Sequence, residues 1–258
     1  MAPPAGKLLA GKHALVTGGG SGIGAAIARA LAAEGAVLSL AGRRKEPLEA
    51  MAKELPKAAA IVADVTHEFD CQAMADQAHA AHGPIDIVIA NAGMAASAPA
   101  AKIDAAHWQQ MIGVNLTGAF NTVHAALADV TRQPGGRIVF IASTAGLKGY
   151  PYVAAYVAAK HGVVGLMRAL SVELAGKGTT VNAVCPGFTE TPLLAGAVDN
   201  ITAKTGRSAE ASRAELAKDN PHGRLITPEE VASTVAWLCA PSSASVNGQA
   251  IAVTGGPV

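Results

Sequence analysis

Residues 17–24 read TGGGSGIG, and they lie between the β-type run HALVT and the alanine-rich helical pattern AAIARALAAEG. A glycine turn that joins a strand to a helix lets backbone N–H groups approach a pyrophosphate and directs the positive end of the helix dipole toward it. The placement therefore predicts a dinucleotide-binding β–α unit. The alternative is a purely structural turn, because the chain holds 28 glycines and tight turns need glycine in any protein.

The remaining chain repeats the alternation of strand and helix. Short apolar runs of β type predict strands over 13–17, 37–41, 60–63, 85–90, 137–142, 180–185 and 250–253. Amphipathic or alanine-rich segments predict helices over 22–34, 45–54, 67–82, 104–130, 154–176 and 228–239. Strands that alternate with long helices are typical of an α/β fold, so the sequence predicts a doubly wound parallel sheet with helices on both faces.

The segment from about 188 to 227 breaks this alternation, because apolar residues, proline, glycine and charges are mixed there without a strand pattern. Connections of this length inside a compact domain are usually functional. We therefore predict a single domain over residues 1–258, with a lid over the substrate at about 188–227.

Composition argues against several classes of partner. The 20 Lys and Arg residues against 19 Asp and Glu leave a formal charge of +1 with no long run of one sign, so neither nucleic acid nor an anionic membrane is an expected partner. The sequence contains no run of 18 or more apolar residues, so no membrane span is predicted. Three cysteines without metal-type spacing favour a reducing, cytoplasmic compartment and predict no metal site. The expected partner is a small, nearly neutral ligand.

The end of the second predicted strand bears on the choice of dinucleotide. About 20 residues after the glycine turn, an NAD-binding protein places a carboxylate on the ribose 2′-hydroxyl, whereas this chain has Arg43 and Arg44. An arginine there can pair with a 2′-phosphate, which favours NADP(H) through Arg43. Two alternatives stay open: the arginines solvate the strand end, or one of them stacks on the adenine, which would serve NAD(H) equally well.

Polar residues follow the third and fourth predicted strands, at the edge where open α/β sheets bind ligands. Asp64 and Val65 follow the third strand, and Asn91, Ala92 and Gly93 follow the fourth. The Asp64 carboxylate could accept a hydrogen bond from an adenine amino group. Alternatively, Asp64 and Asn91 only cap the elements that follow them.

All three tyrosines lie between residues 150 and 156, and only Tyr156 has a lysine four positions later, at Lys160. Positions i and i+4 share one face of a helix. A positive charge at about 5 Å, with an effective dielectric of about 20, is worth about 3 kcal/mol, which predicts a phenol pKa about two units below its usual value of about 10. Tyr156 would then exchange protons near neutral pH, and Ser143 would hydrogen-bond the same substrate oxygen. The alternative is an aromatic patch at an interface.

Asn115 lies in the middle of the predicted helix 104–130, where asparagine is a mediocre helix former. A buried amide at this position could pass protons through water to Lys160. The alternative is a polar contact that kinks the helix.

Taken together, these residues resemble the classical short-chain dehydrogenase/reductase family over essentially the whole chain. The resemblance is carried by Thr17-Gly18-x-x-x-Gly22-x-Gly24, Asp64, Asn91-Ala92-Gly93, Asn115, Ser143, Tyr156-x-x-x-Lys160 and Pro186-Gly187 followed by Thr191. It implies a Rossmann-type seven-stranded sheet, a nicotinamide held by the segment after Pro186, and a homotetramer formed through the helices at about 104–130 and 154–176. It also implies a catalytic tetrad of Asn115, Ser143, Tyr156 and Lys160.

The motifs and the resemblance define two further sets of residues. The predicted dinucleotide-binding residues are Gly18, Ser21, Gly22, Ile23, Gly24, Arg43, Asp64, Val65, Asn91, Ala92, Gly93, Tyr156, Lys160, Pro186, Gly187, Thr189 and Thr191. The predicted substrate pocket consists of Ser143, Tyr150, Tyr152, Tyr156, Phe188, Leu193 and Leu194. Apolar residues at the start of the 188–227 segment suit a hydrophobic ketone or acyl chain.

Two positions depart from the family pattern. Ser21 stands where many NADP-dependent members carry a basic residue, so the NADP(H) preference depends on Arg43 alone. Thr254 stands where the family usually has an acid, so one tetramer contact lacks its usual carboxylate.

The sequence is similar in particular to β-ketoacyl-thioester reductases, including polyketide ketoreductases, and to 3-hydroxyacyl-thioester dehydrogenases. We therefore expect an NAD(P)(H)-dependent oxidoreductase that interconverts a secondary alcohol and a ketone. The expected substrate is a 3-oxoacyl thioester or another hydrophobic ketone. Two other classes stay open: a non-catalytic NADP(H)-binding sensor of the same fold, and a sheet protein with a structural or assembly role.

Overall fold

The computed structural model describes residues 7–258, so the first six residues of the predicted domain lie outside the described part. The strands in this part are β1 (His13–Thr17), β2 (Val37–Gly42), β3 (Ala58–Val62), β4 (Ile87–Ala90), β5 (Arg137–Ile141), β6 (Thr180–Pro186) and β7 (Ala250–Val253). The helices are α1 (Gly22–Ala33), α2 (Lys45–Glu54), α3 (Glu68–His82), α4 (Ala105–Ile112), α5 (Gly118–Ala125), α6 (Leu127–Val130), α7 (Ala154–Leu174), α8 (Pro192–Thr205), α9 (Ala209–Lys218) and α10 (Pro228–Cys239).

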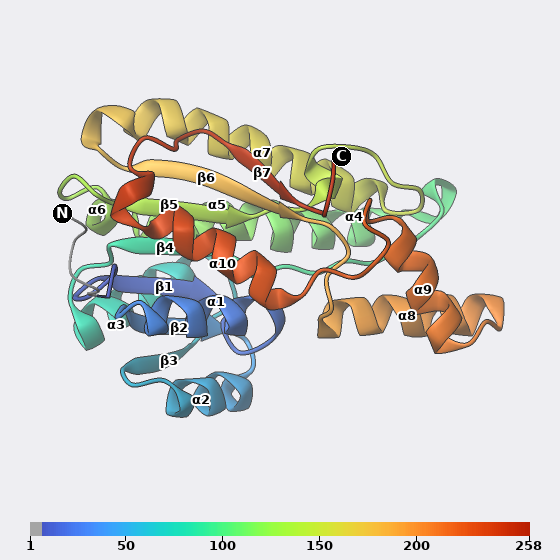
Figure 1. Ribbon diagram of the computed structural model, residues 1–258, viewed down its shortest axis with the longest axis horizontal. Helices are drawn as coiled ribbons and strands as arrows, with labels where there is room; N and C mark the ends of the chain where they lie inside the picture. The colour runs from blue at the N-terminus through green and yellow to red at the C-terminus, as the bar shows by residue number, and fades with distance from the viewer. Residues whose placement is uncertain (1–6) are drawn as a thin grey trace.

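The strands form one sheet in the order β3-β2-β1-β4-β5-β6-β7, and every neighbouring pair is parallel. The chain therefore winds outward from β1 in one direction and, after returning to β4, outward in the other direction (Figure 1). The carboxyl ends of β1 and β4 lie side by side where the winding reverses, which is where open α/β sheets bind ligands. This topology confirms the predicted Rossmann-type, doubly wound, seven-stranded sheet.

Alternate side chains of the central strands enter two separate cores, one on each face of the sheet. Leu15 of β1 belongs to a core with residues of α3, α5 and α7, whereas its neighbours Ala14 and Val16 belong to a core with residues of α1 and α10. Figure 1 shows α1 and α10 together on one face. Because neighbouring strand residues point to opposite faces, a strand covered on both faces needs an unbroken apolar run.

The stretch 104–130, predicted as one helix, is divided in the structure. A π-helical turn at Gly113–Thr117 separates α4 from α5. Within this turn the Asn115 side chain donates to the Met111 carbonyl (3.0 Å), four residues earlier. A side chain that competes for a backbone acceptor disturbs the regular helix ladder. The prediction of one uninterrupted helix was therefore wrong, and π turns of this kind are frequent at functional sites.

Two strands, β3 and β4, begin two residues away from their predicted starts. β3 runs over 58–62 rather than 60–63, and β4 begins at Ile87 rather than at residue 85. The backbone N–H of Ile85 donates to the Asp129 carboxylate in α6 (2.9 Å) instead of to a neighbouring strand. Backbone pairing with the neighbouring strands begins at the next residue, where the Asp86 N–H donates to the His13 carbonyl (2.9 Å).

The segment 188–227 carries the helices α8 and α9, which extend past the end of the sheet (Figure 1). The Thr191 hydroxyl caps α8 by accepting from the Leu194 N–H (3.2 Å), and Pro192 follows at the first helical position. The two ends of the segment meet at an isolated parallel bridge between Thr189 and Ile226. The segment is therefore a helical insertion beyond the sheet, and its two ends lie side by side at the Thr189–Ile226 bridge, which we call the neck of the segment.

Two further observations bear on the compositional predictions. Cys71, Cys185 and Cys239 are buried and form no disulfide. Within residues 7–258, none of the helices combines the length and the hydropathy that a membrane crossing requires.

Candidate active site

In the glycine turn after β1, close contacts leave no room for a Cβ at Gly18 or Gly24. Gly18 and Gly22 have φ angles of +66° and +53°, a region that favours glycine. A Cβ on Gly24 would lie 2.2 Å from the Gly18 carbonyl oxygen. Ser21 precedes α1 without a side-chain hydrogen bond to the helix, so it leaves the N–H groups of the first turn uncapped. The turn therefore fits a pyrophosphate, which needs close backbone approach and N–H donors.

Asn91, at the end of β4, braces this turn. Its side-chain amide donates to the carbonyls of Thr17 (2.8 Å) and Gly18 (3.4 Å), and its backbone N–H donates to the Thr17 hydroxyl (3.1 Å). The N–H of Ala92 donates to the same hydroxyl (3.2 Å). Asn91 and Ala92, predicted to bind the dinucleotide, thus hold the turn in shape. Thr17 completes the brace, a role that its place in the glycine motif did not reveal.

Arg43 and Asp64 lie at neighbouring strand ends and contact each other, with 3.9 Å between Arg43 Nη1 and Asp64 Oδ2. Asp64 also accepts hydrogen bonds from the Thr66 N–H (3.0 Å) and hydroxyl (2.8 Å). Burial raises the pKa of Asp64, but the Thr66 hydrogen bonds and the Arg43 charge outweigh burial and hold that pKa below its usual value. Any contact of this carboxylate with an adenine amino group therefore competes with Thr66 and Arg43.

Arg44 was not predicted as a site residue, yet it also reaches the glycine turn. Its Nη2 donates to the Ser21 hydroxyl (3.4 Å). Ser21 is the position that lacks the basic side chain of many NADP-dependent relatives, so Arg44 brings a guanidinium to that place from a different strand end. The Arg43-Arg44 pair in the sequence was the available signal.

The helix α7 and the end of β5 bring three predicted catalytic residues together. Lys160 is 4% exposed, and its ammonium donates to the Ile141 carbonyl of β5 (2.9 Å). Its Nζ lies 5.7 Å from the centroid of the Tyr156 ring, which is half-buried. Ser143 follows β5 and accepts from the Ala145 N–H (3.1 Å), and the neighbouring Ser143 side chain acts to lower the pKa of Tyr156. The i, i+4 spacing thus places the phenol and the ammonium on one face at the carboxyl edge of the sheet.

The protonation of this group differs from the prediction. Burial raises the pKa of Tyr156, and the Ser143 side chain opposes that rise without cancelling it. Burial also lowers the pKa of Lys160 to about 8. The prediction of a phenol with a lowered pKa was wrong, because burial opposes charge on both side chains and is the largest influence on each.

Asn115 lies beside Lys160 but is occupied by backbone groups. Its amide donates to the carbonyls of Met94 (2.9 Å) and Met111 (3.0 Å), and its Oδ1 accepts from the Met94 N–H (3.2 Å). A Cβ on Gly93 would lie 3.0 Å from Asn115 Oδ1 and 3.7 Å from Lys160 Nζ. Gly93, at the end of β4, is therefore the residue across which Asn115 and Lys160 meet.

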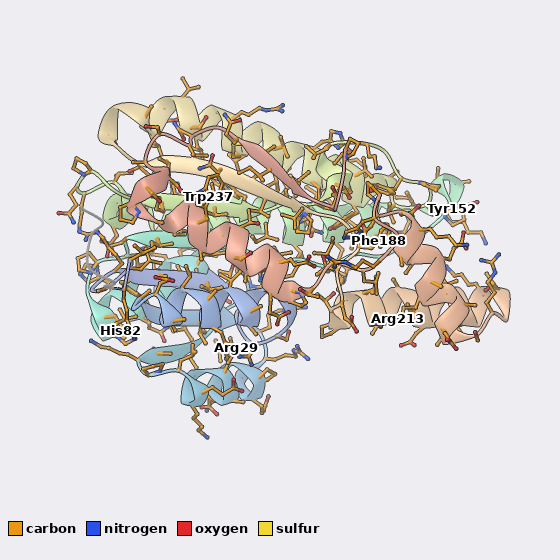
Figure 2. All side chains as sticks on the ribbon, in the orientation of Figure 1. Arg29, His82, Tyr152, Phe188, Arg213 and Trp237 are labelled. Atoms are coloured by element: carbon orange, nitrogen blue, oxygen red, sulfur yellow. The ribbon has the colours of Figure 1, made fainter. Side chains whose placement is uncertain are left out.

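The predicted pocket residues separate into two groups. The Tyr150 hydroxyl donates to Thr144 Oγ1 (2.8 Å), and its ring meets the Phe188 ring edge-on, with 6.0 Å between centroids. Tyr152 is instead 66% exposed, and Figure 2 shows it farther out than Phe188. On α8, Leu194 is buried, whereas Leu193 is 47% exposed. The structure thus brings Tyr150 and Phe188 together and turns Tyr152 and Leu193 toward the surface.

The segment predicted to hold the nicotinamide adjoins the glycine turn. The Gly187 N–H donates to the Val253 carbonyl (3.0 Å), and the Thr189 hydroxyl donates to the Gly187 carbonyl (2.9 Å). A Cβ on Gly22 would contact Thr191 Cγ2 at 3.4 Å. The start of α8 therefore lies against the start of α1, and the two dinucleotide-binding predictions fall on neighbouring surfaces. Pro186, Ile23 and Val65 contribute backbone positions at the same edge.

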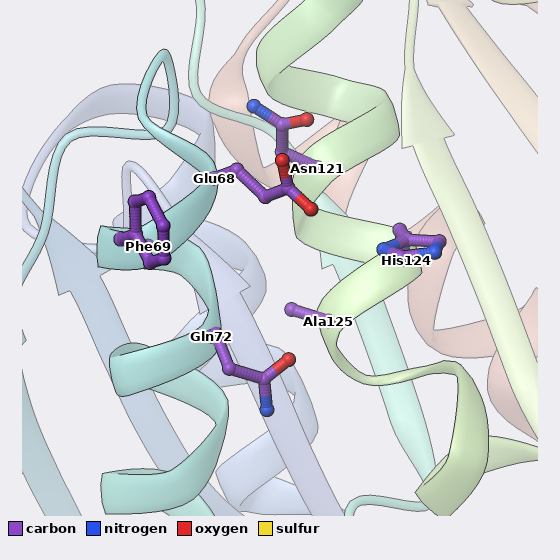
Figure 3. A pocket seen from close by; sticks show the side chains of 6 residues that line it. All are labelled: Glu68, Phe69, Gln72, Asn121, His124 and Ala125. Atoms are coloured by element: carbon purple, nitrogen blue, oxygen red, sulfur yellow. The ribbon is translucent and has the colours of Figure 1, made fainter.

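A shallow hollow between α3 and α5 contains none of the predicted site residues (Figure 3). Its lining residues are Glu68, Phe69, Gln72, Asn121, His124 and Ala125. Within residues 7–258, no group of three or more His, Cys, Asp or Glu side chains is arranged to hold a metal ion.

Known proteins resemble this chain over nearly its whole length. The family model described as short chain dehydrogenase matches residues 12–202. D-beta-hydroxybutyrate dehydrogenase of Cupriavidus necator is 36% identical over 256 residues, which cover 96% of this chain and 98% of that protein. The 3-oxoacyl-(acyl-carrier-protein) reductase FabG of Thermotoga maritima is 35% identical over 254 residues, which cover 97% of this chain and 99% of that protein.

Among solved structures, a variant of actinorhodin polyketide ketoreductase with NADPH matches with a TM-score of 0.91. The two chains are 38% identical, and the match covers 95% of this chain and 96% of the other. The family model, the two relatives and the solved structure therefore agree on one family.

Proposed function

The chain belongs to the short-chain dehydrogenase family, and on that premise we propose that it reduces a β-ketoacyl thioester or a similar hydrophobic ketone with NADPH. Its reaction class is that of an oxidoreductase acting between a secondary alcohol and a ketone with a nicotinamide dinucleotide. One observation carries the proposal: Tyr156, Ser143 and Lys160 meet at the carboxyl edge of the sheet that also holds the glycine turn.

We assign the dinucleotide to this edge for two reasons. The glycines have no side chains to keep a ligand away from the backbone, and the first N–H groups of α1 have no side-chain cap. The residues proposed to hold it are Gly18, Ser21, Gly22, Ile23, Gly24, Arg43, Asp64, Val65, Asn91, Ala92, Gly93, Tyr156, Lys160, Pro186, Gly187, Thr189 and Thr191. When bound, the reduced dinucleotide supplies the hydride for the ketone carbon.

Tyr156 is the proposed proton donor to the ketone oxygen. Because burial raises the pKa of this phenol, the hydroxyl stays protonated at neutral pH, which suits donation during reduction. Ser143 would hydrogen-bond the same oxygen and stabilise the negative charge that develops on it. The Lys160 ammonium, held at Ile141, would stabilise the phenolate that remains after proton transfer.

Asn115 has a positioning role in this proposal. Its three hydrogen bonds hold Met94 and Met111 and support a fixed π turn beside Lys160. Gly93 lies between the Asn115 amide and the ammonium, so a change at Asn115 would alter the surroundings of Lys160. This positioning role is proposed in place of the predicted passage of protons through water to Lys160.

The substrate assignment draws on the relatives and on α8. Several relatives are described as ketoacyl or 3-oxoacyl reductases. Leu194 and Val198 are buried on α8, and Phe188 packs on Tyr150 near Ser143, which supports an apolar pocket wall. A hydrophobic ketone suits such a wall better than a small polar one.

The preference for NADP(H) rests on Arg43, with Arg44 beside it at Ser21. Charge-assisted hydrogen bonds from guanidinium groups are the strongest contacts available to a 2′-phosphate. The ketoreductase structure with NADPH agrees with this choice. NAD(H) is the alternative.

We also propose a homotetramer built through α4–α6 and α7, in a reducing cytoplasm. Trp108 on α4, Phe120 on α5 and Val172 on α7 are large apolar side chains left exposed on the protomer. The three buried, unpaired cysteines support the reducing compartment. The mass of the particle in solution tests the assembly.

The deciding experiment measures oxidation of NADPH and NADH in the presence of acetoacetyl thioester, cyclic ketones and aryl ketones. We expect ketone-dependent oxidation of NADPH, and slower oxidation of NADH. Tight binding of NADPH without turnover of any ketone would instead identify a sensor. Failure to bind either dinucleotide would leave only a structural role.

A further inference from the structure

Asn220 lies between α9 and α10, is 1% exposed, and makes three hydrogen bonds with its side chain. Its Oδ1 accepts from the Phe188 N–H (2.9 Å), and its Nδ2 donates to the Phe188 carbonyl (2.9 Å). The same Nδ2 donates to the Arg224 carbonyl (2.7 Å). One carboxamide thus binds both main-chain groups of Phe188, in the way that a neighbouring strand would.

The space around this carboxamide is tightly defined. A Cβ on Gly187 would lie 2.2 Å from Asn220 Oδ1, so the side chain reaches Phe188 only because glycine precedes it. The Phe188 carbonyl also accepts from the Ile226 N–H (2.9 Å), at the neck of the 188–227 segment. Phe188 lies outside the regular strands and helices, so these bonds determine its backbone conformation.

The residue held in this way carries a ring that points toward the proposed ketone site. Phe188 meets Tyr150 edge-on, with an angle of 87° between the rings. The Tyr150 hydroxyl in turn donates to Thr144 Oγ1 (2.8 Å), next to Ser143 in the chain. A continuous series of contacts therefore leads from Asn220 through Phe188 and Tyr150 to the residue beside Ser143.

We propose that Asn220 is a positioning residue that fixes Phe188, and through it Tyr150, in the wall of the ketone pocket, and thereby determines which ketones fit. The inference rests on the proposed function and goes beyond it by assigning substrate discrimination to a residue that touches no reacting atom. Loss of the carboxamide would leave the Phe188 carbonyl bonded to the Ile226 N–H but would leave the Phe188 N–H without its partner, and that N–H would find another only if Phe188 moved.

The test is a double-mutant cycle of Asn220→Ala and Phe188→Ala, measured with a bulky aryl ketone and with a small ketone. In the otherwise unchanged protein, Asn220→Ala should raise KM for the aryl ketone at least about tenfold and lower kcat less than about threefold. In the Phe188→Ala background it should change KM less than about twofold, because Asn220 acts on the pocket through the position of the Phe188 ring, which that background lacks. Independent, multiplying effects would overturn the proposal, and so would equal effects on both ketones.

Asn200→Ala is the matched control on the same segment. Asn200 of α8 donates a single hydrogen bond to the Ser97 hydroxyl (2.9 Å), away from Phe188. Its loss should leave KM within about twofold of the original value, since it does not hold the pocket wall. An equal rise in KM for this variant would mean that any loosening of the segment has the same effect, which contradicts a specific role for Asn220.

Hydrogen exchange supplies a readout that needs no turnover. Asn220→Ala should speed exchange of the Phe188 N–H and leave the strand amides of β6 unchanged, and unchanged protection of Phe188 would overturn the proposal. If that variant does not fold, Asn220→Asp keeps the acceptor for the Phe188 N–H, loses both donor bonds and enters the same cycle. If the unaltered protein reduces no ketone, the proposed function fails, while the exchange result still decides whether Asn220 holds Phe188.

Discussion

The two halves of the carboxyl edge are held by different kinds of contact. At β1 and β4 the backbone itself fills the space, so that a Cβ on Gly24 would meet a carbonyl oxygen at 2.2 Å. At β5, β6 and the 188–227 segment, side chains hold the site: Lys160 binds Ile141, and Asn220 binds Phe188. The dinucleotide side therefore has no space for a Cβ at Gly24, whereas the contacts of the ketone side can be removed by changing single side chains.

Removing the proton donor should have the largest effect and should separate the two halves most clearly. We expect Tyr156→Phe to lower kcat/KM at least about a thousandfold, given what acid–base and oxyanion contacts are worth. The Kd for NADPH should stay nearly unchanged, because the substitution removes only the Tyr156 hydroxyl and leaves the glycine turn and the other proposed contacts in place. Steady-state kinetics and a fluorescence titration of NADPH measure the two quantities. Near-native turnover by this variant would show that another group donates the proton.

The glycine turn offers the next largest effect and a control in the other half. Gly24→Ala forces the turn to move, which we expect to cost more than about 2 kcal/mol of stability and most of the affinity for NADPH. Gly196→Ala on α8 meets nothing within 4 Å, so it should raise stability by up to about 1 kcal/mol, as alanine does within helices. Urea unfolding and NADPH titration compare the variants. Equal tolerance at both positions would contradict the contrast between the two halves.

The arginines sharpen the comparison within the dinucleotide half. Arg43→Ala should weaken NADPH binding by about 1.5 to 3 kcal/mol, the worth of a hydrogen bond to a charged group, and leave NADH binding nearly unchanged. Arg44→Ala is the companion variant, since its guanidinium contacts Ser21 rather than Asp64. Calorimetric titration with both dinucleotides gives the affinities. Equal losses for NADPH and NADH would remove the assignment of Arg43 to the 2′-phosphate.

The smallest expected effect concerns the buried ammonium of the ketone half. Burial lowers the pKa of Lys160 to about 8, whereas an unfolded lysine titrates near 10.4. Between these values the unfolded state binds more protons, so stability rises with pH. Relative to Lys160→Met, the original protein should gain about 1 kcal/mol of unfolding free energy between about pH 7 and pH 9. Urea titrations of both proteins at the two pH values measure these unfolding free energies. A difference between the two proteins that does not change with pH would contradict the lowered pKa of Lys160.

Local patterns account for most of the fold. Short apolar runs, separated by helical patterns, predict all of the observed strands. The runs are continuous because a strand covered on both faces must be apolar throughout. The break at Asn115 escaped prediction because half of its cause lies elsewhere in the chain: its amide binds Met94, 21 residues away, as well as Met111. The contact of Arg44 with Ser21 was not predicted for a similar reason, since it joins turns that lie 23 residues apart in the sequence.

By itself, the sequence determined the doubly wound sheet, the glycine turn and the pairing of Tyr156 with Lys160, because each depends on spacing within one strand, turn or helix. Only the tertiary structure decided that burial raises the pKa of Tyr156 and lowers that of Lys160, and that Asn220 holds Phe188. Burial and long-range hydrogen bonds depend on segments that meet after folding, so no local pattern of residues records them.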